Sequence, residues 1–273
     1  MSETARPSEN GVLNFLDALR VQGSVIGALI LRELHTRYGR RGLGYLWLFL
    51  EPMLLACLVV SIRVFARDHL TYGRGIGGVP FIILGYTMFI MFRGIFNRAE
   101  SALEANLPLM YHRMVSIFDI LFARALLEAA ASMIAFLILI GLCISLDMAD
   151  LPARPLYYIS GFFQYLWFSF ALSLIICAGT YENTTAQKFV HPISYILLPL
   201  SGAFFMVYWL PHHVRGLVAY WPMTSMFEEM RYGWFYSASG DYFYPDYVVG
   251  CNMVLTLLGL LAIAAVRRKV ELK

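Results

Sequence analysis

The sequence has few charged residues. Only 14% of its 273 residues are Asp, Glu, Lys or Arg, whereas a soluble domain carries about 25%. Hydrophobic residues make up 59% of the chain. This composition excludes a soluble globular enzyme and indicates an integral membrane protein.

A nucleotide-binding loop is also missing from the sequence. A Walker A loop ends in a Gly-Lys pair that holds the phosphates of ATP. Glycine precedes none of the lysines, which are Lys188, Lys269 and Lys273. We therefore expect this chain to be no enzyme and to bind no cofactor of its own. If it belongs to an ATP-driven pump, another polypeptide binds ATP and magnesium.

Groups that could carry catalysis or hold a metal are scarce as well. His191 and the His212–His213 pair have no cysteine or acid at a metal-ligand or triad spacing. Glu228 and Glu229 are adjacent, which puts them on different faces of a helix. The cysteines lie in apolar runs and are expected to be buried hydrophobic residues rather than disulfide partners or zinc ligands: Cys57, Cys143, Cys177 and Cys251.

Six apolar runs are long enough to cross a bilayer. They lie at about residues 43–62, 79–96, 124–146, 156–179, 190–210 and 248–266. About 20 helical residues cover a hydrocarbon core of roughly 30 Å. Lipid cannot satisfy an open strand, so we expect an all-α fold with six transmembrane helices. Residues 15–273 should form one domain behind a polar tail, residues 1–14, which lacks the apolar core of a cleaved signal.

The distribution of basic residues predicts the orientation. Six spans place both termini on the same side of the membrane. Most arginines and lysines then fall on that side, including the cluster Arg267–Lys269 directly after the last span. Because basic residues collect in cytoplasmic segments, we expect both termini in the cytoplasm.

The segment from Arg32 to Pro52 leads from a basic helix into the first span. On a helical wheel one arc carries Ile26, Ile30, Leu31, Leu34 and Tyr38. The other arc carries Arg32, Glu33, Thr36, Arg37 and Arg40, with the apolar exceptions Val25 and Leu29. This pattern predicts an amphipathic helix at headgroup depth with its arginines in water. A simple juxtamembrane anchor would look the same.

Three motifs carry a resemblance to a known family. They are LGYLWLFLEPM at Leu43–Met53 with the preceding Arg37-Tyr38, PLSGAFF at Pro199–Phe205 and WPMTSMFEEMRYGWF at Trp221–Phe235. Together they resemble type-2 ABC exporter permeases, and within them the inner-membrane permeases that export capsular polysaccharide. The likeness extends from about Phe15 to Arg268. It implies a type-2 ABC transmembrane domain with re-entrant or amphipathic segments between spans five and six, in the bacterial inner membrane.

Between spans two and three the sequence predicts a short helix from Asn97 to Pro108. Asn97 and Glu100 have the spacing of a capping box, and Pro108 marks an end. In the family resembled, this element is the coupling helix that docks on an ATPase, although a solvated helix start would have the same pattern. The predicted coupling residues are Arg37, Arg40, Arg41, Asn97, Glu100, Glu104 and Asn106.

Ionisable and aromatic residues within the spans suggest a path for a polymer. Glu51 and Arg93 each cost about 2.5–3.5 kcal/mol at the bilayer centre, so both are expected to face protein or water unless they snorkel to an interface. Aromatic rings can stack on sugars, but most also serve in packing and in interfacial belts. The predicted conduit residues are Tyr45, Trp47, Glu51, Tyr86, Phe92, Arg93, Phe204, Tyr208 and Trp209. On span one we expect Trp47 and Glu51 to share a face that Phe49 opposes.

The resemblance implies the permease subunit of an ABC exporter that moves lipid-linked capsular polysaccharide from cytoplasm to periplasm. Its expected partners are a second copy of itself, two copies of an ATPase subunit, and periplasmic and outer-membrane export components. Membrane lipid and the lipid-linked polymer are expected ligands, and nucleic acid is not. An O-antigen or teichoic-acid exporter is the alternative within this class. An intramembrane glycosyl- or acyltransferase and a structural scaffold are alternatives from other classes.

Overall fold

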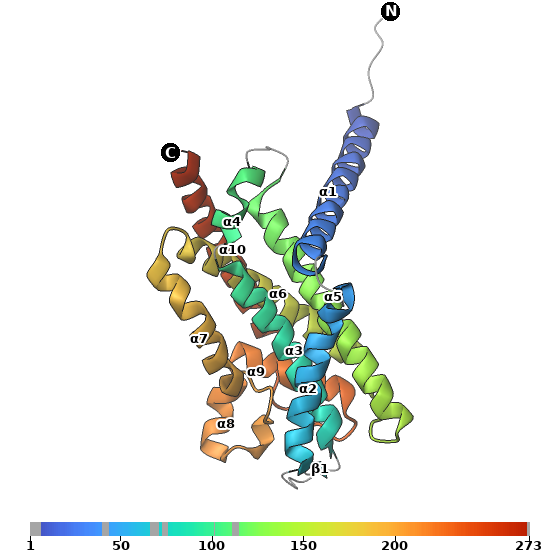
Figure 1. Ribbon diagram of the computed structural model, residues 1–273. Helices are drawn as coiled ribbons and strands as arrows, with labels where there is room; N and C mark the ends of the chain where they lie inside the picture. The colour runs from blue at the N-terminus through green and yellow to red at the C-terminus, as the bar shows by residue number, and fades with distance from the viewer. Residues whose placement is uncertain are drawn as a thin grey trace, which may run out of the picture.

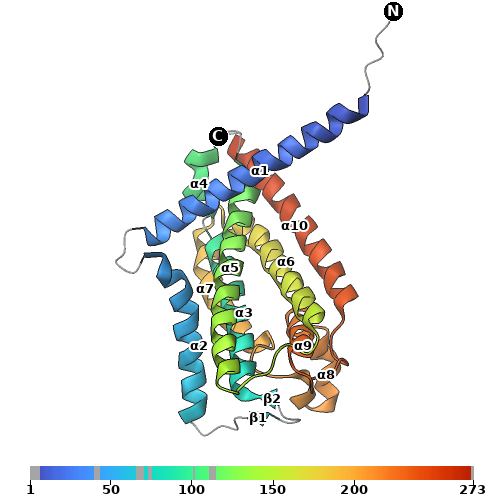
Figure 2. The same ribbon diagram turned by 90° about the vertical axis from the view of Figure 1, so that its right-hand side faces the viewer.

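The computed structural model describes residues 7–39, 44–65, 71–72, 76–100, 102–110 and 115–271. Its elements in chain order are α1 (Pro7–Tyr38), η1 (Gly44–Leu46), α2 (Trp47–Phe65), β1 (Thr71–Tyr72), β2 (Ile76–Gly77), α3 (Gly78–Ala99), α4 (Ala102–Met110), α5 (Ile117–Ser145), α6 (Pro155–Thr180), α7 (Thr184–Leu200), η2 (Val207–Trp209), α8 (His212–Ala219), α9 (Pro222–Trp234) and α10 (Pro245–Glu271). Figures 1 and 2 show a helical bundle with α1, α4 and the end of α10 at one end, called here the α4 end. The opposite end, where α8 and α9 lie, is called the α9 end.

Five helical segments of the described chain are long and apolar enough to cross a membrane. They are Gly44–Ile62, Gly78–Ala99, Ile117–Ser145, Pro155–Thr180 and Pro245–Arg268, and they match five of the six expected spans. The α3 and α6 segments lie inside the bundle, with 72% and 67% of their most apolar windows buried. The segments of α2 and α10 are only 17% and 22% buried, so their apolar side chains face outward. The expected membrane class is confirmed.

The remaining apolar run, residues 190–210, is not one helix. Helix α7 has 17 residues and contains Pro192 and Pro199. It ends at Leu200, and Gly202 then adopts a φ of +87°, a left-handed conformation that glycine permits. A turn follows, and the chain resumes as the short helix η2. In Figure 1, α7 runs from the α4 end toward α8, and it contacts α3 and α6.

The turn after α7 is held by a buried arginine. Arg231 of α9 is 0% exposed, and its guanidinium donates to the carbonyl oxygens of Gly202 (2.6 Å), Ala203 (2.8 Å) and Phe205 (2.6 Å). Its carboxylate partner is Glu228 at 3.4 Å, which accepts a hydrogen bond from the Val207 backbone N–H at 3.0 Å. These bonds replace the helical ones that the broken backbone lacks.

Helix α9 lies in the segment where re-entrant or amphipathic helices are expected, between the predicted spans five and six. Its residues from Met223 to Arg231 are all buried, and it packs on α6 and α10. Its buried acids have protein partners: Glu228 binds Arg231, and Glu229 accepts from Gln164 at 2.9 Å. The neighbouring α8, in contrast, is largely exposed.

Helix α1 packs on the bundle and contacts α5, and Figure 2 shows it crossing the α4 end. Among its residues whose burial is described, Leu29 and Glu33 are buried, at 7% and 8% exposure, whereas Leu31 is 59% exposed. Leu31 was predicted on the buried arc but is exposed, and Leu29, an apolar residue on the predicted polar arc, lies in the core. The reason is that the packing face includes charged residues that have partners inside the protein. The helix begins at Pro7.

The predicted capping box at Asn97 is wrong. Asn97 lies inside α3, which continues to Ala99, and α4 begins only at Ala102. Helix α4 also continues past Pro108 to Met110. A capping box exists instead at Ser116 and Asp119, where α5 begins. The two short strands β1 and β2 pair antiparallel and are the exception to the all-helical expectation.

Candidate translocation cleft and coupling surface

A cleft of about 420 Å³ lies between α2, α3, α5 and α7. Its lining comprises Leu48, Glu51, Pro52 and Leu55 of α2, Ile90, Arg93, Gly94, Asn97 and Arg98 of α3, Glu128, Ala131 and Ser132 of α5, and His191 of α7. The residues from each helix follow a spacing of three or four, so each helix turns one face to the cleft. The structure thus brings together Glu51, Arg93 and Asn97, which the sequence had singled out separately.

The predicted aromatic wall of α2 does not face this cleft. Trp47 and Phe49 both pack against a small apolar cluster of Leu48, Leu127 and Ala131. The two rings were expected on opposite faces, with Trp47 beside Glu51. In the structure Leu48, rather than Trp47, lines the cleft with Glu51. Tyr45 lies in η1, and its ring meets His35 edge-on at 5.8 Å between centroids.

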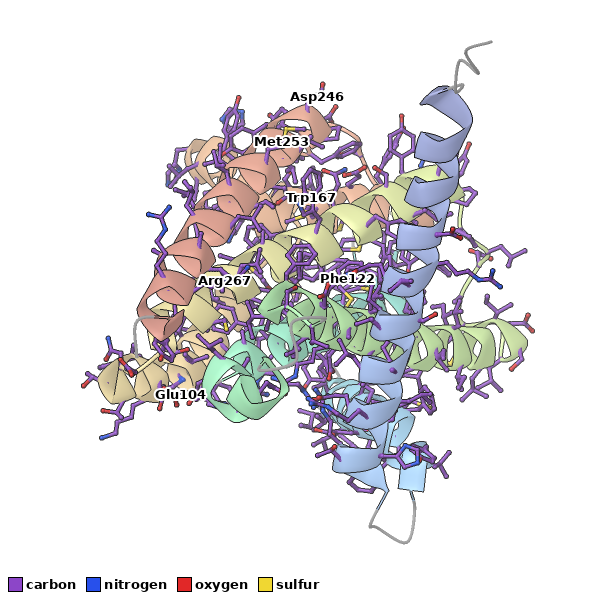
Figure 3. The ribbon with its side chains drawn as sticks, turned by 90° about the horizontal axis from the view of Figure 1, so that it is seen from above. Glu104, Phe122, Trp167, Asp246, Met253 and Arg267 are labelled. Atoms are coloured by element: carbon purple, nitrogen blue, oxygen red, sulfur yellow. The ribbon has the colours of Figure 1, made fainter. Side chains whose placement is uncertain are left out.

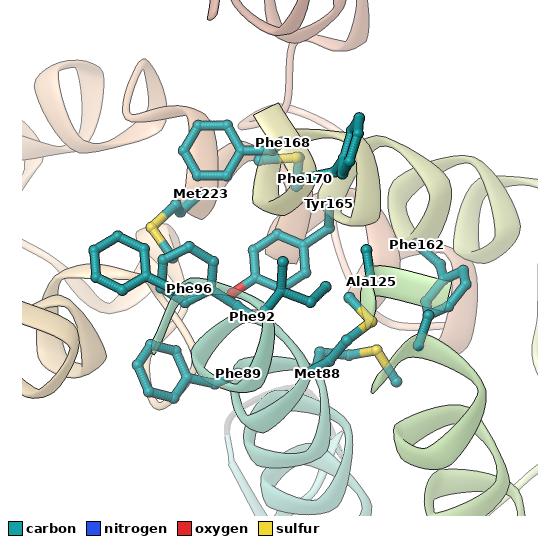
Figure 4. Close-up of a cluster of buried hydrophobic side chains, with 14 of the residues drawn as sticks. Met88, Phe89, Phe92, Phe96, Ala125, Phe162, Tyr165, Phe168, Phe170 and Met223 are labelled. Atoms are coloured by element: carbon teal, nitrogen blue, oxygen red, sulfur yellow. The ribbon is translucent and has the colours of Figure 1, made fainter. Parts of the chain in front are cut away.

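Phe92 is a core residue rather than a conduit residue. It is 0% exposed and lies among Phe89, Phe96, Tyr165 and Phe168, at 5.2–6.4 Å between ring centroids. Figure 4 shows these rings meeting between α3 and α6. The aromatic content of α3 had suggested a substrate surface, but the packing of this central helix buries the ring.

The other predicted aromatic residues lie toward the α9 end. Tyr86 of α3 stacks on Phe204 at 5.9 Å, and Trp209 lies 5.2 Å from Phe81. Tyr208 is 41% exposed. The predicted conduit residues therefore form two groups: Glu51 and Arg93 at the cleft, and these aromatic residues nearer α8 and α9.

A cluster of charged residues joins α1, α3 and α5 beside the cleft. Glu128 of α5 accepts from Arg37 of α1 at 2.7 Å and from Arg98 of α3 at 2.9 Å. Glu33 of α1 pairs with Arg37 and, at 3.1 Å, with Arg124 of α5. Burial alone would raise the pKa of Glu33, but the guanidinium groups of Arg37 and Arg124 outweigh it and lower that pKa below 4.5. Arg37, a predicted coupling residue, is thus held within this chain.

Helix α4 is tied to its neighbours by two of the predicted coupling residues. Asn106 is buried and accepts a hydrogen bond from Arg32 of α1. Glu104 accepts from the backbone N–H of Glu182 at 2.8 Å. Figure 3, which looks onto the α4 end, shows Glu104 where α4 meets the start of α7. Helix α4 therefore rests on both α1 and the α6–α7 turn.

Glu100, another predicted coupling residue, faces α7. Its carboxylate lies 3.4 Å from His191, so it links the end of α3 to the cleft wall. Asn97 lines the cleft itself. Arg40 and Arg41 lie outside the described residues.

Comparison with known proteins identifies the family. Residues 24–235 match the ABC-2 type transporter family. The chain belongs to this family. It is 38% identical over 258 residues to the capsule polysaccharide export inner-membrane protein CtrC of Neisseria meningitidis, covering 94% of this chain and 97% of CtrC. It is 36% identical to the capsule polysaccharide export inner-membrane protein BexB of Haemophilus influenzae, covering 94% and 96%. The polysialic acid transport protein KpsM of Escherichia coli is 35% identical over 159 residues, 58% of each chain.

Membership in the ABC-2 family confirms the resemblance seen in the three motifs. It also agrees with the missing Walker A loop, because an ABC-2 permease works with an ATPase subunit. The matched residues include the cleft, the charged cluster and α4.

Several residues of this ABC-2 permease escaped the sequence argument. Glu128 lies within a span, as Glu51 and Arg93 do. The cost of a charge in an apolar run could therefore have indicated that Glu128 has a partner. Glu33 and Arg37 have the four-residue spacing of an ion pair, but nothing in that spacing points to Glu128. Arg231 lay in a motif already singled out, and no local pattern shows that it binds the turn after α7.

Proposed function

We propose that this chain is the membrane permease of an ATP-driven exporter that carries capsule polysaccharide across the inner membrane. The observation that supports this most is its similarity to CtrC and BexB over 94% of its length. Shorter matches could share only a membrane scaffold. The family match, residues 24–235, also includes the cleft, α4 and α9.

The proposed topology has six crossings and both termini in the cytoplasm. The α7 segment and the turn behind it supply the sixth crossing, and Arg231 satisfies the backbone where that crossing is not helical. Both ends of the described chain lie at the α4 end in Figure 1, as six crossings require. The α4 end is then cytoplasmic.

The proposed assembly contains two copies of this chain, because six helices make a thin wall for a polymer path and a twofold axis closes it. Two ATPase subunits bind at the α4 end through α4 and the basic residues that follow α1. Periplasmic and outer-membrane export components continue the path. Glu51 and Arg93 in the cleft contact the lipid-linked polymer on its way.

Deletion of the gene in its own host tests this function. Without the permease, cells should lose surface polysaccharide and accumulate the polymer inside, because synthesis continues while export stops. Expression of the intact chain from a plasmid should restore the surface polymer, and an equally expressed chain that lacks α4 should not. Unchanged surface polysaccharide in the deletion strain would contradict the proposal.

A further inference from the structure

Arg93 is a cation within a membrane span, and it has no acidic partner among the described residues. It lies on α3, is half-buried, and lines the cleft. Among the described residues no carboxylate lies within ion-pair distance of its guanidinium. Its Nε is buried without a hydrogen-bond partner in that part of the chain. A charged residue within a span normally has a partner, so the site requires an additional anion or acceptor.

The ring of Tyr195 meets only part of this requirement. It lies 3.9 Å from the Arg93 guanidinium carbon, so it covers one flat face of the group. A guanidinium donates its hydrogen bonds in its own plane, and two of its nitrogens form a fork that suits a phosphate. Stacking on Tyr195 therefore orients the fork and leaves its in-plane edge, including Nε, without a hydrogen-bond partner in the part of the chain that the structure describes.

The other basic residues that line the cleft have acidic partners in the described chain. Arg98 is bound to Glu128 at 2.9 Å, and His191 lies 3.4 Å from Glu100. Asn97, one helical turn beyond Arg93, has a buried side-chain oxygen with no partner in the described chain. Only its NH2 group could donate to an anion held by Arg93, because the side-chain oxygen is an acceptor.

The depth and the apolar walls of the cleft identify the class of anion. Arg93 lies six residues before the end of α3, which is about 9 Å along the helix axis. At this depth a long arginine side chain reaches the boundary between acyl chains and headgroups. Apolar side chains share the cleft, and they belong to α2 and α3: Leu48, Pro52, Leu55 and Ile90. A cation next to an apolar surface suits the binding of an amphiphile, whose anionic head pairs with the cation while its chain packs on the apolar side chains.

We propose that the cleft binds the phosphate group of a membrane lipid, with the Arg93 guanidinium on the phosphate and the lipid chain against α2. The phosphate can belong to a phospholipid or to the lipid anchor of an exported polymer, and the site recognises the chemistry that these share. Glu51 lies on the α2 wall of the same cleft. Its negative charge opposes the phosphate and keeps the affinity low enough for release.

The test measures lipid binding to the purified permease–ATPase complex in a phosphate-free detergent. Native mass spectrometry counts phosphatidylglycerol molecules that remain bound as the lipid is titrated. Arg93→Gln should weaken binding at least about tenfold, because a charge-assisted hydrogen bond is lost. The matched control is Arg20→Gln, which removes an exposed charge on α1 far from the cleft lining and should leave binding unchanged. Dioleoylglycerol, which has the chains without the phosphate, should not bind.

Two further variants keep the test decisive if Arg93→Gln does not fold. Arg93→Lys keeps the charge and should retain most of the binding. Glu51→Lys replaces the opposing acid with a second cation and should tighten binding several-fold. Equal losses in Arg93→Gln and Arg20→Gln, or weaker binding in Glu51→Lys, would overturn the proposal. Displacement of the lipid by millimolar inorganic phosphate would show a free-anion site and would also overturn it. None of these outcomes depends on which polymer the exporter carries.

Discussion

Replacement of Arg231 by methionine should destabilise this protein more than almost any other single substitution. Methionine is of similar length and fills the space, but it cannot donate to the three carbonyl oxygens of the turn after α7. It also leaves Glu228, which is 2% exposed, as a buried carboxylate without its cation.

The magnitude follows from these losses. Removal of one partner of a buried ion pair costs about 3–5 kcal/mol, and each lost hydrogen bond contributes about 1 kcal/mol. Because all of these contacts share one guanidinium, the costs overlap rather than add. We expect a loss of about 4 kcal/mol in the free energy of unfolding. In a chain of this size that corresponds to a fall of roughly 10 °C in Tm.

Thermal unfolding of the purified permease in detergent is a suitable assay, with Arg215→Met as the matched control. Arg215 also binds a carbonyl oxygen, that of Leu210 at 2.7 Å, but it is half-buried, so its loss should cost less than about 1 kcal/mol. The double variant Arg231→Met with Glu228→Gln should recover part of the lost Tm, since it removes the unpaired carboxylate. An Arg231→Met protein as stable as the wild type would refute this account. So would a double variant that is less stable than the single one.

Two more substitutions test the packing of α3 and α1. Gly85→Ala should lower the Tm measurably, because a Cβ at Gly85 would lie 2.1 Å from the carbonyl oxygen of Ala203. The control Gly141→Ala should not lower the Tm, because its Cβ would meet nothing within 4 Å. Equal Tm values for the two variants would mean that α3 and the turn after α7 are not in close contact. Glu33→Gln should lower the free energy of unfolding at pH 7. The difference in this free energy between the variant and the wild type should shrink as the pH falls below the ordinary pKa range of a glutamate. The reason is that a carboxylate whose pKa is lowered by folding stabilises the fold above its unfolded pKa and loses that contribution when it is protonated. A difference that does not change with pH would indicate that the charge of Glu33 contributes nothing to stability.

Much of the membrane fold was predictable because hydropathy is a property of consecutive residues. Five of the six apolar runs match the long helices of the structure, and the ends differ by at most seven residues, at the start of α5. The special status of Glu51 and Arg93 followed from the cost of charge in a span, and both line the cleft. The absence of a Gly-Lys pair is likewise a local fact of the sequence.

What the sequence left undecided concerns pairs of residues far apart in the chain. The Arg37–Glu128 pair joins positions 91 residues apart, and it turns α1 so that a charged stripe faces the protein. The periodicity of α1 could not show this, because a wheel separates polar from apolar residues and assigns the polar side to water.

The same limit explains Phe92 and Arg231. A ring in an apolar run looks alike whether it faces lipid, substrate or core, and only the position of α3 at the centre of the bundle buries Phe92. Arg231 has no local pattern that shows its partners, because the break at Gly202 brings three backbone carbonyls to it from residues more than 20 positions away. The sequence by itself determined which segments enter the membrane, since the insertion of each segment depends on its own hydropathy. Tertiary structure alone decided which polar groups meet inside, since a buried charge is stable only where packing brings it a partner.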